Sequence, residues 1–269
     1  MNNPTLSMLA KIIEKRYPKS LASEWDSVGL IIGNQKNIIN KILLTVDITT
    51  KVIDEAIKNS YDLIISHHPF ILEPEEVEDI KNYKNTLKQK IEKENISIYV
   101  AHTNADIASE GVNDSLVKKF NLKNAKSFGI DNLGRMGVIE EPVNLSQLVD
   151  KIIKVIPLNK NAIQISGDKN KIVKTVAVCG GSGSSLLEQV RKLGVDVFIT
   201  ADLKHHQVLD NLELNGPSLI SISHWASERV WLDDFQQILK KDLHKENFDL
   251  DIIISNETTD PWTFSKGFD

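Results

Sequence analysis

The sequence has very little cysteine, no long apolar run and no excess of basic charge. Its 269 residues include a single cysteine, Cys179, so the chain cannot form a disulfide within itself or build a zinc site from several thiolates. No stretch approaches the roughly 18 consecutive apolar residues that a membrane-spanning helix needs. These absences exclude a disulfide-stapled fold and a chain held by a membrane helix.

The charge balance is mildly acidic. There are 32 Lys and Arg residues against 37 Asp and Glu residues, which gives a formal net charge of −5. This balance argues against nucleic acid as a partner, because nucleic-acid-binding surfaces are basic. Residues 1–20 lack the apolar core and small-residue cleavage site of a secretory signal, so we expect a cytoplasmic protein without a membrane partner.

The length and composition predict two globular lobes. Hydrophobic residues make up 41% and charged residues 26% of the chain, which is typical of a soluble protein. The chain is longer than one hydrophobic core usually serves. We expect a first α/β lobe over residues 1–125, joined by the C-terminal segment 236–269, and a second α/β lobe over residues 126–235.

Strands and helices alternate along the sequence. The predicted strands are residues 24–33, 41–47, 61–70, 96–102, 218–224 and 251–255, and the predicted helices are residues 5–16, 49–60, 111–122 and 226–243. Residues 175–206 read as strand, glycine-rich turn, helix and strand. The charged residues 73–95 predict a loop and a solvated helix, and residues 140–146 predict a loop. This pattern predicts an α/β fold of two related lobes, each with a mixed or mostly parallel sheet and flanking helices.

The two halves resemble each other. Asp62 in YDLIIS matches Asp196 in VDVFIT, 134 positions later, and the same offset aligns Ile42 with Val176. Further along, His102 aligns with His224 at a shorter offset of 122. The offset is shorter because the charged region at residues 73–95 makes the first half longer. The pattern predicts an internal repeat of a strand–helix–strand unit.

The histidines cluster just after predicted strands. In parallel sheets, ligands collect beyond the carboxyl ends of the strands. His244 lies elsewhere, in a charged helix tail, but the other six histidines occupy such positions: His67, His68, His102, His205, His206 and His224. Each one alone is more typical of a hydrogen-bonded loop residue, whereas the whole set favours a shared metal site.

Two carboxylates accompany these histidines. Asp106 follows His102 by four positions, and Glu228 follows His224 by four positions. Neutral imidazole and carboxylate together suit zinc, iron, manganese or nickel. His67 and His68 would diverge in an extended strand, but a turn at Pro69 would let them serve two neighbouring ions. The sequence therefore favours a dinuclear centre.

The glycine run at residues 180–183 has two interpretations. It could cradle a phosphate before a helix, but it lacks the lysine of a P-loop and the spacing of a dinucleotide-binding loop. A tight strand-to-helix turn is the favoured interpretation. Cys179, which precedes the run, is expected to be a packed structural thiol.

Several segments occur together in a recognisable order: EWDSVGLIIG, LLTVDITTKVIDEAI, DLIISHHPF, YVAHTNAD with GVNDSL, VAVCGGSG, DVFITADLKHH and SHWASE. The paired histidines with proline and the late His-x-x-x-Glu are the specific elements. The chain thereby resembles the NIF-three-like proteins, a dinuclear metal-centre, hexameric family often labelled GTP cyclohydrolase I type 2 homologues.

The resemblance implies a set of ligands. Two divalent ions, whose identity stays open among zinc, iron, manganese, magnesium and nickel, would lie between the lobes, and Glu228 would bridge them. Glu228 and His102 are the implied catalytic residues, and His102, Asp202, His205 and His206 would lie behind the ligands or in the pocket. The implied ligands are His67, His68, Asp106, His224 and Glu228.

The resemblance also implies a function and an assembly. It points to a metal-dependent hydrolase that acts on a small phosphorylated or nucleotide-like substrate such as GTP, in a toroidal homohexamer of the family's short form. Two alternatives stay open. One is a non-catalytic metal-binding, metal-delivery or ring-scaffold protein, and the other is a nucleic-acid-binding ring, against which the acidic net charge argues.

Overall fold

The chain folds into two compact units. The computed structural model describes residues 3–70, 77–157 and 163–266. Met1–Ser109 and Leu232–Thr259 form unit 1, and Glu110–Trp231 and Asp260–Asp269 form unit 2. These bounds differ from the expected ones at two places. Helix α5 (Val112–Lys119), expected in the first lobe, packs on strands β6 (Gly134–Asn144) and β8 (Ile172–Ser182) of unit 2. The segment from Asp260 onward, expected with the first lobe, belongs to unit 2.

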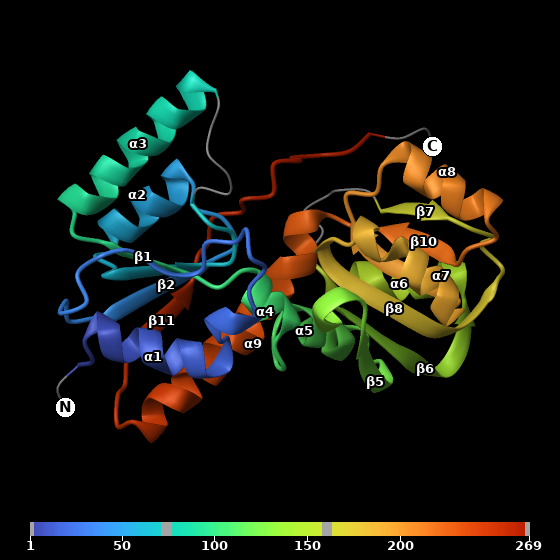
Figure 1. The fold of residues 1–269 in the computed structure, drawn as a ribbon, viewed down its shortest axis with the longest axis horizontal. Coiled ribbons are helices and arrows are strands. Elements are labelled where there is room, and N and C mark those ends of the chain that lie inside the picture. Colours follow the sequence, from blue (N-terminus) through green and yellow to red (C-terminus); the bar gives the residue numbers. More distant parts are fainter. Residues whose placement is uncertain (1–2, 71–76, 158–162, 267–269) are drawn as a thin grey trace. The chain divides into compact units, whose positions relative to one another are not determined.

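Unit 1 is built on a five-stranded sheet (Figure 1). The strand order is β1-β4-β3-β2-β11, in which β1 runs antiparallel to β4 and the other neighbours are parallel. The apolar side chains of the central strands are buried on both faces, as expected for parallel strands covered by helices. The strand bounds are Gly29–Ile32 for β1, Lys41–Thr45 for β2, Leu63–Ser66 for β3, Ser97–Val100 for β4 and Asp251–Ile254 for β11.

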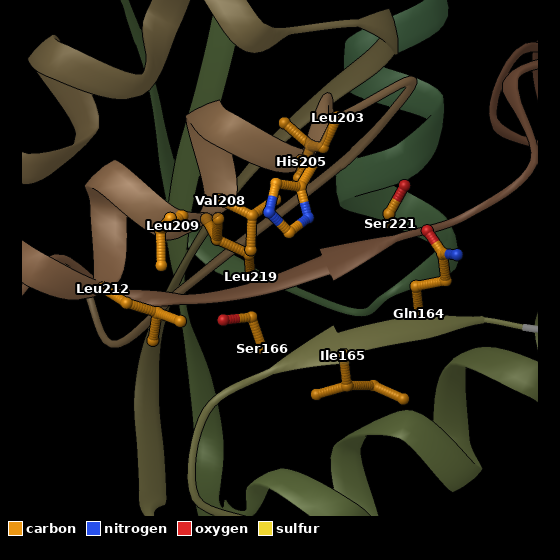
Figure 2. Close-up of a pocket in the computed structure, with 10 residues that line it drawn as sticks. All are labelled: Gln164, Ile165, Ser166, Leu203, His205, Val208, Leu209, Leu212, Leu219 and Ser221. Atoms are coloured by element: carbon orange, nitrogen blue, oxygen red, sulfur yellow. The ribbon is translucent and has the colours of Figure 1, made fainter.

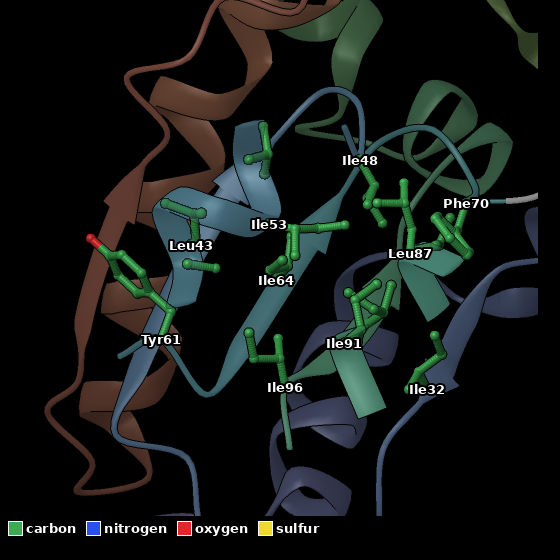
Figure 3. Packing of buried hydrophobic residues seen from close by; sticks show 14 residues of the cluster. Ile32, Leu43, Ile48, Ile53, Tyr61, Ile64, Phe70, Leu87, Ile91 and Ile96 are labelled. Carbon is green, nitrogen blue, oxygen red and sulfur yellow. The ribbon is translucent and has the colours of Figure 1, made fainter. Parts of the chain in front are cut away.

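Helices cover both faces of this sheet. Figure 1 shows α2 and α3 on one face and α1 and α9 on the other. Figure 3 shows Ile53 of α2 and Leu87 and Ile91 of α3 packed with Leu43 and Ile64 of the sheet. The helices of unit 1 are α1 (Leu6–Arg16), α2 (Thr50–Lys58), α3 (Glu78–Lys93), α4 (Thr103–Ile107) and the later part of α9 (His224–Lys245), with a 3-10 turn, η1, at Lys19–Leu21.

Helices α2 and α3 begin where the sequence predicts them to begin, α2 after its Thr49 cap and α3 within the charged region. Thr49 caps α2, since its hydroxyl accepts a hydrogen bond from the Val52 amide, as the sequence predicts. Helix α3 begins at Glu78, inside the charged region that predicts a solvated helix. The beginning of the predicted loop, residues 73–76, lies outside the described residues.

Unit 2 is built on a six-stranded mixed sheet of order β5-β6-β8-β9-β10-β7. Strands β8, β9 and β10 are parallel, and the other neighbours are antiparallel. The predicted α/β architecture, two sheets with flanking helices, is thus confirmed. The strand bounds not yet given are Lys123–Phe128 for β5, Gln164–Ser166 for β7, Val197–Ala201 for β9 and Ser218–Ser221 for β10.

The predicted loop over residues 140–146 is wrong. Strand β6 continues to Asn144, because Val143 and Asn144 pair with Val173 and Ile172 of β8. Helix α6 then follows at once, with Asn144 as its cap. The polar residues of this segment therefore belong to a half-exposed antiparallel strand, which carries a weaker apolar signal than a buried parallel one.

Two helical layers enclose the second sheet. Helices α5 and α6 and the first turns of α9 pack on one face, and α7 and α8 pack on the other. Cys179 is buried in the α7 layer beside Val190 and Phe198, so it is a packed thiol as expected. The helix bounds are Leu145–Val155 for α6, Leu187–Leu193 for α7 and His205–Glu213 for α8, with 3-10 turns at Ile130–Asn132 (η2) and Ser184–Leu186 (η3). Within the described residues, none of the helices has the length and apolarity needed to cross a bilayer.

The internal repeat is visible in the strand order. Each unit contains three successive parallel strands, β2-β3-β4 in unit 1 and β8-β9-β10 in unit 2, with an earlier strand added antiparallel to the third. Asp62 accepts hydrogen bonds from the Asn40 and Lys41 amides, and Asp196 accepts them from the Lys174 and Thr175 amides. The predicted match of Asp62 with Asp196 is therefore confirmed.

The same repeat corrects the second predicted offset. Gly33 lies against Ser97 and Leu6, and Gly167 lies in the same way against Ser218 and Leu145. Ser97 therefore corresponds to Ser218, at an offset of 121 positions. The predicted alignment of His102 with His224 is wrong by one residue, since at this offset His102 corresponds to Ser223.

A salt bridge ties α1 to the end of α9 within unit 1. The Nε and Nη2 atoms of Arg16 donate to the two carboxylate oxygens of Asp242, at 2.5 and 2.9 Å. These bonds from Arg16, with help from Lys245, lower the pKa of Asp242 from 3.8 to about 2. Such a two-point contact holds both side chains in one geometry.

The substitution Asp242→Asn should destabilise the protein by about 1–2 kcal/mol at pH 7, a range discounted for partial solvent exposure. Because folding lowers this pKa, the stabilisation is complete above about pH 4 and is lost as the pH falls toward 2. Denaturant unfolding at several pH values measures it. The exposed Asp249→Asn variant is the control, and an Asp242→Asn deficit that persists at pH 2 would contradict the assignment.

Candidate metal centre

Two adjacent histidines follow strand β3 in unit 1. The strand ends at Ser66, whose hydroxyl donates to the His68 carbonyl at 2.8 Å and closes a tight turn. The ring centroids of His67 and His68 are consequently only 5.0 Å apart. The divergence expected for neighbours in an extended strand is avoided, because the chain turns at this point.

Each of these two rings is held from behind at Nδ1. The Nδ1 atom of His67 lies 2.9 Å from the Ala101 carbonyl oxygen, and the Nδ1 atom of His68 lies 2.7 Å from Asp47 Oδ1. A carbonyl or ionised carboxylate oxygen can only accept, so Nδ1 carries a proton in both rings, and Nε2 is the nitrogen that the neutral ring offers to a metal ion. This is the tautomer and orientation that metal-binding histidines use.

His102 lies beside the pair. Its ring centroid is 5.2 Å from that of His67 and 5.4 Å from that of His68, and the three imidazoles each offer a nitrogen within 4.8 Å of the others. Its Nδ1 atom lies 3.0 Å from Asp26 Oδ1. Burial opposes ionisation of Asp26, but hydrogen bonds from His102 and Thr103 outweigh it and lower the pKa of this carboxyl.

Asp106 completes the group in unit 1. It lies in the short helix α4, whose cap is His102, and it is 8% exposed. Its Oδ1 atom is 3.6 Å from His67 Nε2. A buried carboxylate beside an imidazole nitrogen is compatible with a pair of metal ligands, because a cation between them would compensate the buried charge.

Unit 2 carries a second group at the start of α9. His224 Nδ1 lies 2.5 Å from Asp202 Oδ2, and His224 Nε2 lies 3.0 Å from Glu228 Oε1. Glu228 is 3% exposed. Carboxylates at both nitrogens favour positive charge at this position, either a proton on the ring or a metal ion between Nε2 and Oε1.

Gly181 makes room for this group. Its φ of +60° lies in the left-handed region, and a Cβ atom there would lie 2.5 Å from Glu228 Oε1 and 3.2 Å from His224 Nε2. The Gly181 amide donates to Ser227 Oγ at 2.8 Å. Glycine thus lets the backbone of β8 run directly behind both ligand atoms.

The amides of the glycine run are bonded within the protein. Gly180 donates to Asn113 Oδ1, Gly181 to Ser227 Oγ and Gly183 to Thr200 Oγ1, each at 2.8 Å. These three N–H groups are therefore not directed at a ligand, and the phosphate-cradle interpretation loses its basis. The run is also not a plain turn, since β8 continues to Ser182 before the 3-10 turn begins.

The distances between the candidate donor atoms can be compared with those around a divalent ion. Ligand atoms about 2.1 Å from one ion lie about 3.0–3.4 Å apart when the angle between them is between 90° and tetrahedral. The 3.0 Å between His224 and Glu228 and the 3.6 Å between His67 and Asp106 are close to this range. The donor set and its spacing are thus compatible with metal binding.

Comparison with known proteins identifies the family of this chain. The family model Duf34/NIF3 (NGG1p interacting factor 3) matches residues 4–261. The chain belongs to the Duf34/NIF3 family. It is similar to a Streptomyces coelicolor protein named GTP cyclohydrolase 1 type 2 homolog, with 33% identity over 97% of this chain and 94% of the relative. NIF3-like protein 1 of Drosophila melanogaster is 32% identical over 95% of this chain and 88% of its own length.

Solved structures show the same Duf34/NIF3 fold. A hypothetical protein from Staphylococcus aureus has a TM-score of 0.89 and 28% identity, and the match covers 98% of this chain and 100% of that one. The structure described as reduced HcgD from Methanocaldococcus jannaschii has a TM-score of 0.78 and 30% identity, over 94% of this chain and 98% of that one.

Three of the groups that hold the imidazoles, Asp47, Asp26 and the Ala101 carbonyl, were not predicted from the sequence. Asp47 follows strand β2, so its position just beyond a strand was a signal that could have identified it, although no histidine lies beside it in the sequence. Asp26 and the Ala101 carbonyl gave no such signal, because their partners lie far away in the sequence. Asp202 was expected behind the ligands, and it does lie behind His224.

His205 and His206 lie apart from the His224 group, at the exposed start of α8. Their rings touch edge to face, with centroids 5.2 Å apart. Figure 2 shows His205 at the edge of a largely apolar pocket between α8 and strands β7 and β10. Among the described residues, neither histidine belongs to a cluster of side chains spaced to share one metal ion.

Asp47→Asn should weaken metal binding about 10–100-fold, because an amide can present N–H to His68 Nδ1 and disturb the tautomer. Equilibrium titration of apo protein with zinc measures the affinity. Asp54→Asn, an exposed carboxylate of α2 paired with Lys90, is the matched control. Unchanged zinc affinity in Asp47→Asn would show that the carboxylate does not orient a ligand.

Gly181→Ala should abolish metal binding at the His224 group, since the new methyl group would overlap Glu228 Oε1. Gly194→Ala is a matched control, because Gly194 also has a left-handed φ (+65°) but has no heavy atom within 4 Å of the added Cβ. Both variants should lose about 1–2 kcal/mol from the backbone conformation. Only Gly181→Ala should also lose bound metal, measured by elemental analysis, and equal metal contents would refute the overlap.

Proposed function

We propose that this protein binds divalent metal ions and uses them to hydrolyse a small anionic substrate. The ligands are His67, His68 and Asp106 in unit 1 and His224 and Glu228 in unit 2. The observation that carries the proposal is shared by all three of these histidines. Each has Nδ1 on an oxygen acceptor, which leaves Nε2 as the nitrogen that a neutral ring presents to a metal ion.

In this proposal the five residues would together hold two divalent ions. That joint assignment rests on the resemblance of the sequence motifs and not on the geometry of either unit. The imidazole-rich set favours zinc, iron, manganese or nickel over magnesium, which prefers oxygen ligands.

Bound divalent ions would lower the pKa of a coordinated water and polarise the bond to be hydrolysed. His102 supplies proton transfer. Asp26 holds the proton on its Nδ1 atom, so Nε2 accepts a proton from the attacking water and later returns it to the leaving group. The pKa of Asp26 is lowered by its hydrogen bonds, so it remains an ionised acceptor for His102 Nδ1.

The substrate class follows from charge. Two divalent ions with the carboxylates of Asp106 and Glu228 leave a net positive charge, which attracts phosphate or another anionic group. Relatives carry the name GTP cyclohydrolase 1 type 2 homolog, so a nucleotide such as GTP is the first substrate to assay. We further propose a homohexamer, which size-exclusion chromatography with light scattering would detect as about six chain masses.

Elemental analysis of protein purified without added metal tests the binding proposal. We expect two ions per chain in the wild type. Glu228→Ala should remove at least one ion, and His224→Gln should do the same, while His244→Gln at the exposed end of α9 should keep both. Fewer than one ion per chain, or a content unaffected by Glu228→Ala, would refute the site.

Turnover tests the hydrolase proposal. His102→Gln should lower kcat for GTP hydrolysis about 10²–10⁴-fold without loss of metal, because it removes a proton acceptor and no assigned ligand. Full metal loading with no turnover of GTP or other phosphorylated metabolites would instead support the alternative of a non-catalytic metal-binding protein.

A further inference from the structure

An exposed tryptophan stands at a pocket of unit 2 that also contains His224. The pocket has a volume of about 350 Å³, within the range of small-molecule sites. Trp262 and Phe264 line it although each is 71% exposed. Large aromatic side chains left so open beside a candidate metal ligand need an explanation, because exposure of this size costs hydrophobic free energy.

The Trp262 backbone is anchored at this place. Asp260 is 7% exposed, and its carboxylate accepts from the Ser223 hydroxyl at 2.6 Å and from the Trp262 amide at 3.0 Å. Ser223 immediately precedes His224. The buried Asp260 carboxylate therefore connects the Trp262 backbone to Ser223, the residue before the candidate ligand His224. This connection holds the Trp262 backbone at the pocket.

The rest of the lining is mixed in polarity. Gln164 and Ser221 are direct cross-strand partners on β7 and β10. Both also line the pocket beside His205, and Figure 2 shows their polar groups at the same end of that pocket. Asp202 adds a carboxylate. An amide, a hydroxyl and a carboxylate in the same pocket as two aromatic side chains suit a flat ring with polar edges, and they suit an apolar peptide helix poorly.

We propose that this pocket binds the planar nitrogen heterocycle of the substrate, such as a nucleobase, by stacking on the Trp262 indole. Phe264 forms a second wall, and Gln164 offers both a donor and an acceptor to the ring edge. This inference rests on the proposed function for its biological meaning, because it places the ring of a nucleotide-like substrate beside His224. Trp262 is thus a specificity-determining residue.

Binding to metal-free protein separates this inference from the proposed function. Isothermal titration calorimetry in EDTA compares guanosine 5′-monophosphate with ribose 5-phosphate, which has the phosphate and sugar but no base. We expect the wild type to bind the nucleotide more tightly than the sugar phosphate. Trp262→Leu should weaken nucleotide binding about 10-fold or more, and Trp262→Phe should restore most of it.

Tyr83→Leu, an exposed aromatic residue of α3, is the control and should bind like the wild type. Equal affinity of the wild type for both probes, no nucleotide binding by the wild type, or unchanged nucleotide affinity in Trp262→Leu would overturn the inference. A change of oligomeric state in Trp262→Leu would overturn it as well, since Trp262 would then cover an interface between copies. Metal content plays no part in this test, so a failed metal site leaves its result interpretable.

Discussion

The oxygen acceptor behind each imidazole is the interaction on which the candidate centre depends. A histidine can coordinate through either nitrogen, and an unrestrained ring also rotates, so a site of several histidines needs each ring fixed. Here the acceptors are Asp47, the Ala101 carbonyl and Asp202, with Asp26 behind His102. Each acceptor lies just before or just after a strand. The hydrogen bonds therefore form only because the pairing of neighbouring strands brings their ends together.

The repeated framework provides that register. In each unit an aspartate at the start of the second parallel strand binds the backbone of the first, and a glycine with positive φ lets a serine of the third strand approach closely. The two units use this framework differently. Unit 1 places its imidazoles after β3 and β4, whereas unit 2 places histidine and glutamate on the first turns of a long helix and uses Gly181 to admit them.

Much of the fold could be read from the sequence, because buried parallel strands leave continuous apolar runs, as in residues 41–47 and 61–70. The predictions failed where that signal is weak. Strand β6 is half exposed and antiparallel, so its polar end was taken for a loop. The equivalence of His102 with His224 failed for a different reason, since an alignment by residue type cannot detect a shift of one position that backbone pairing fixes.

The sequence by itself determined which chemistry the protein carries. One cysteine and seven histidines restrict a metal site to imidazole and carboxylate ligands, and strand-end positions indicate which histidines take part. Only the tertiary structure decided the protonation pattern, the partners of the glycine amides and the place of His205 and His206. These features depend on contacts between distant residues, such as His102 and Asp26, which are 76 positions apart. No local sequence pattern encodes such a contact, because only folding brings the two residues together.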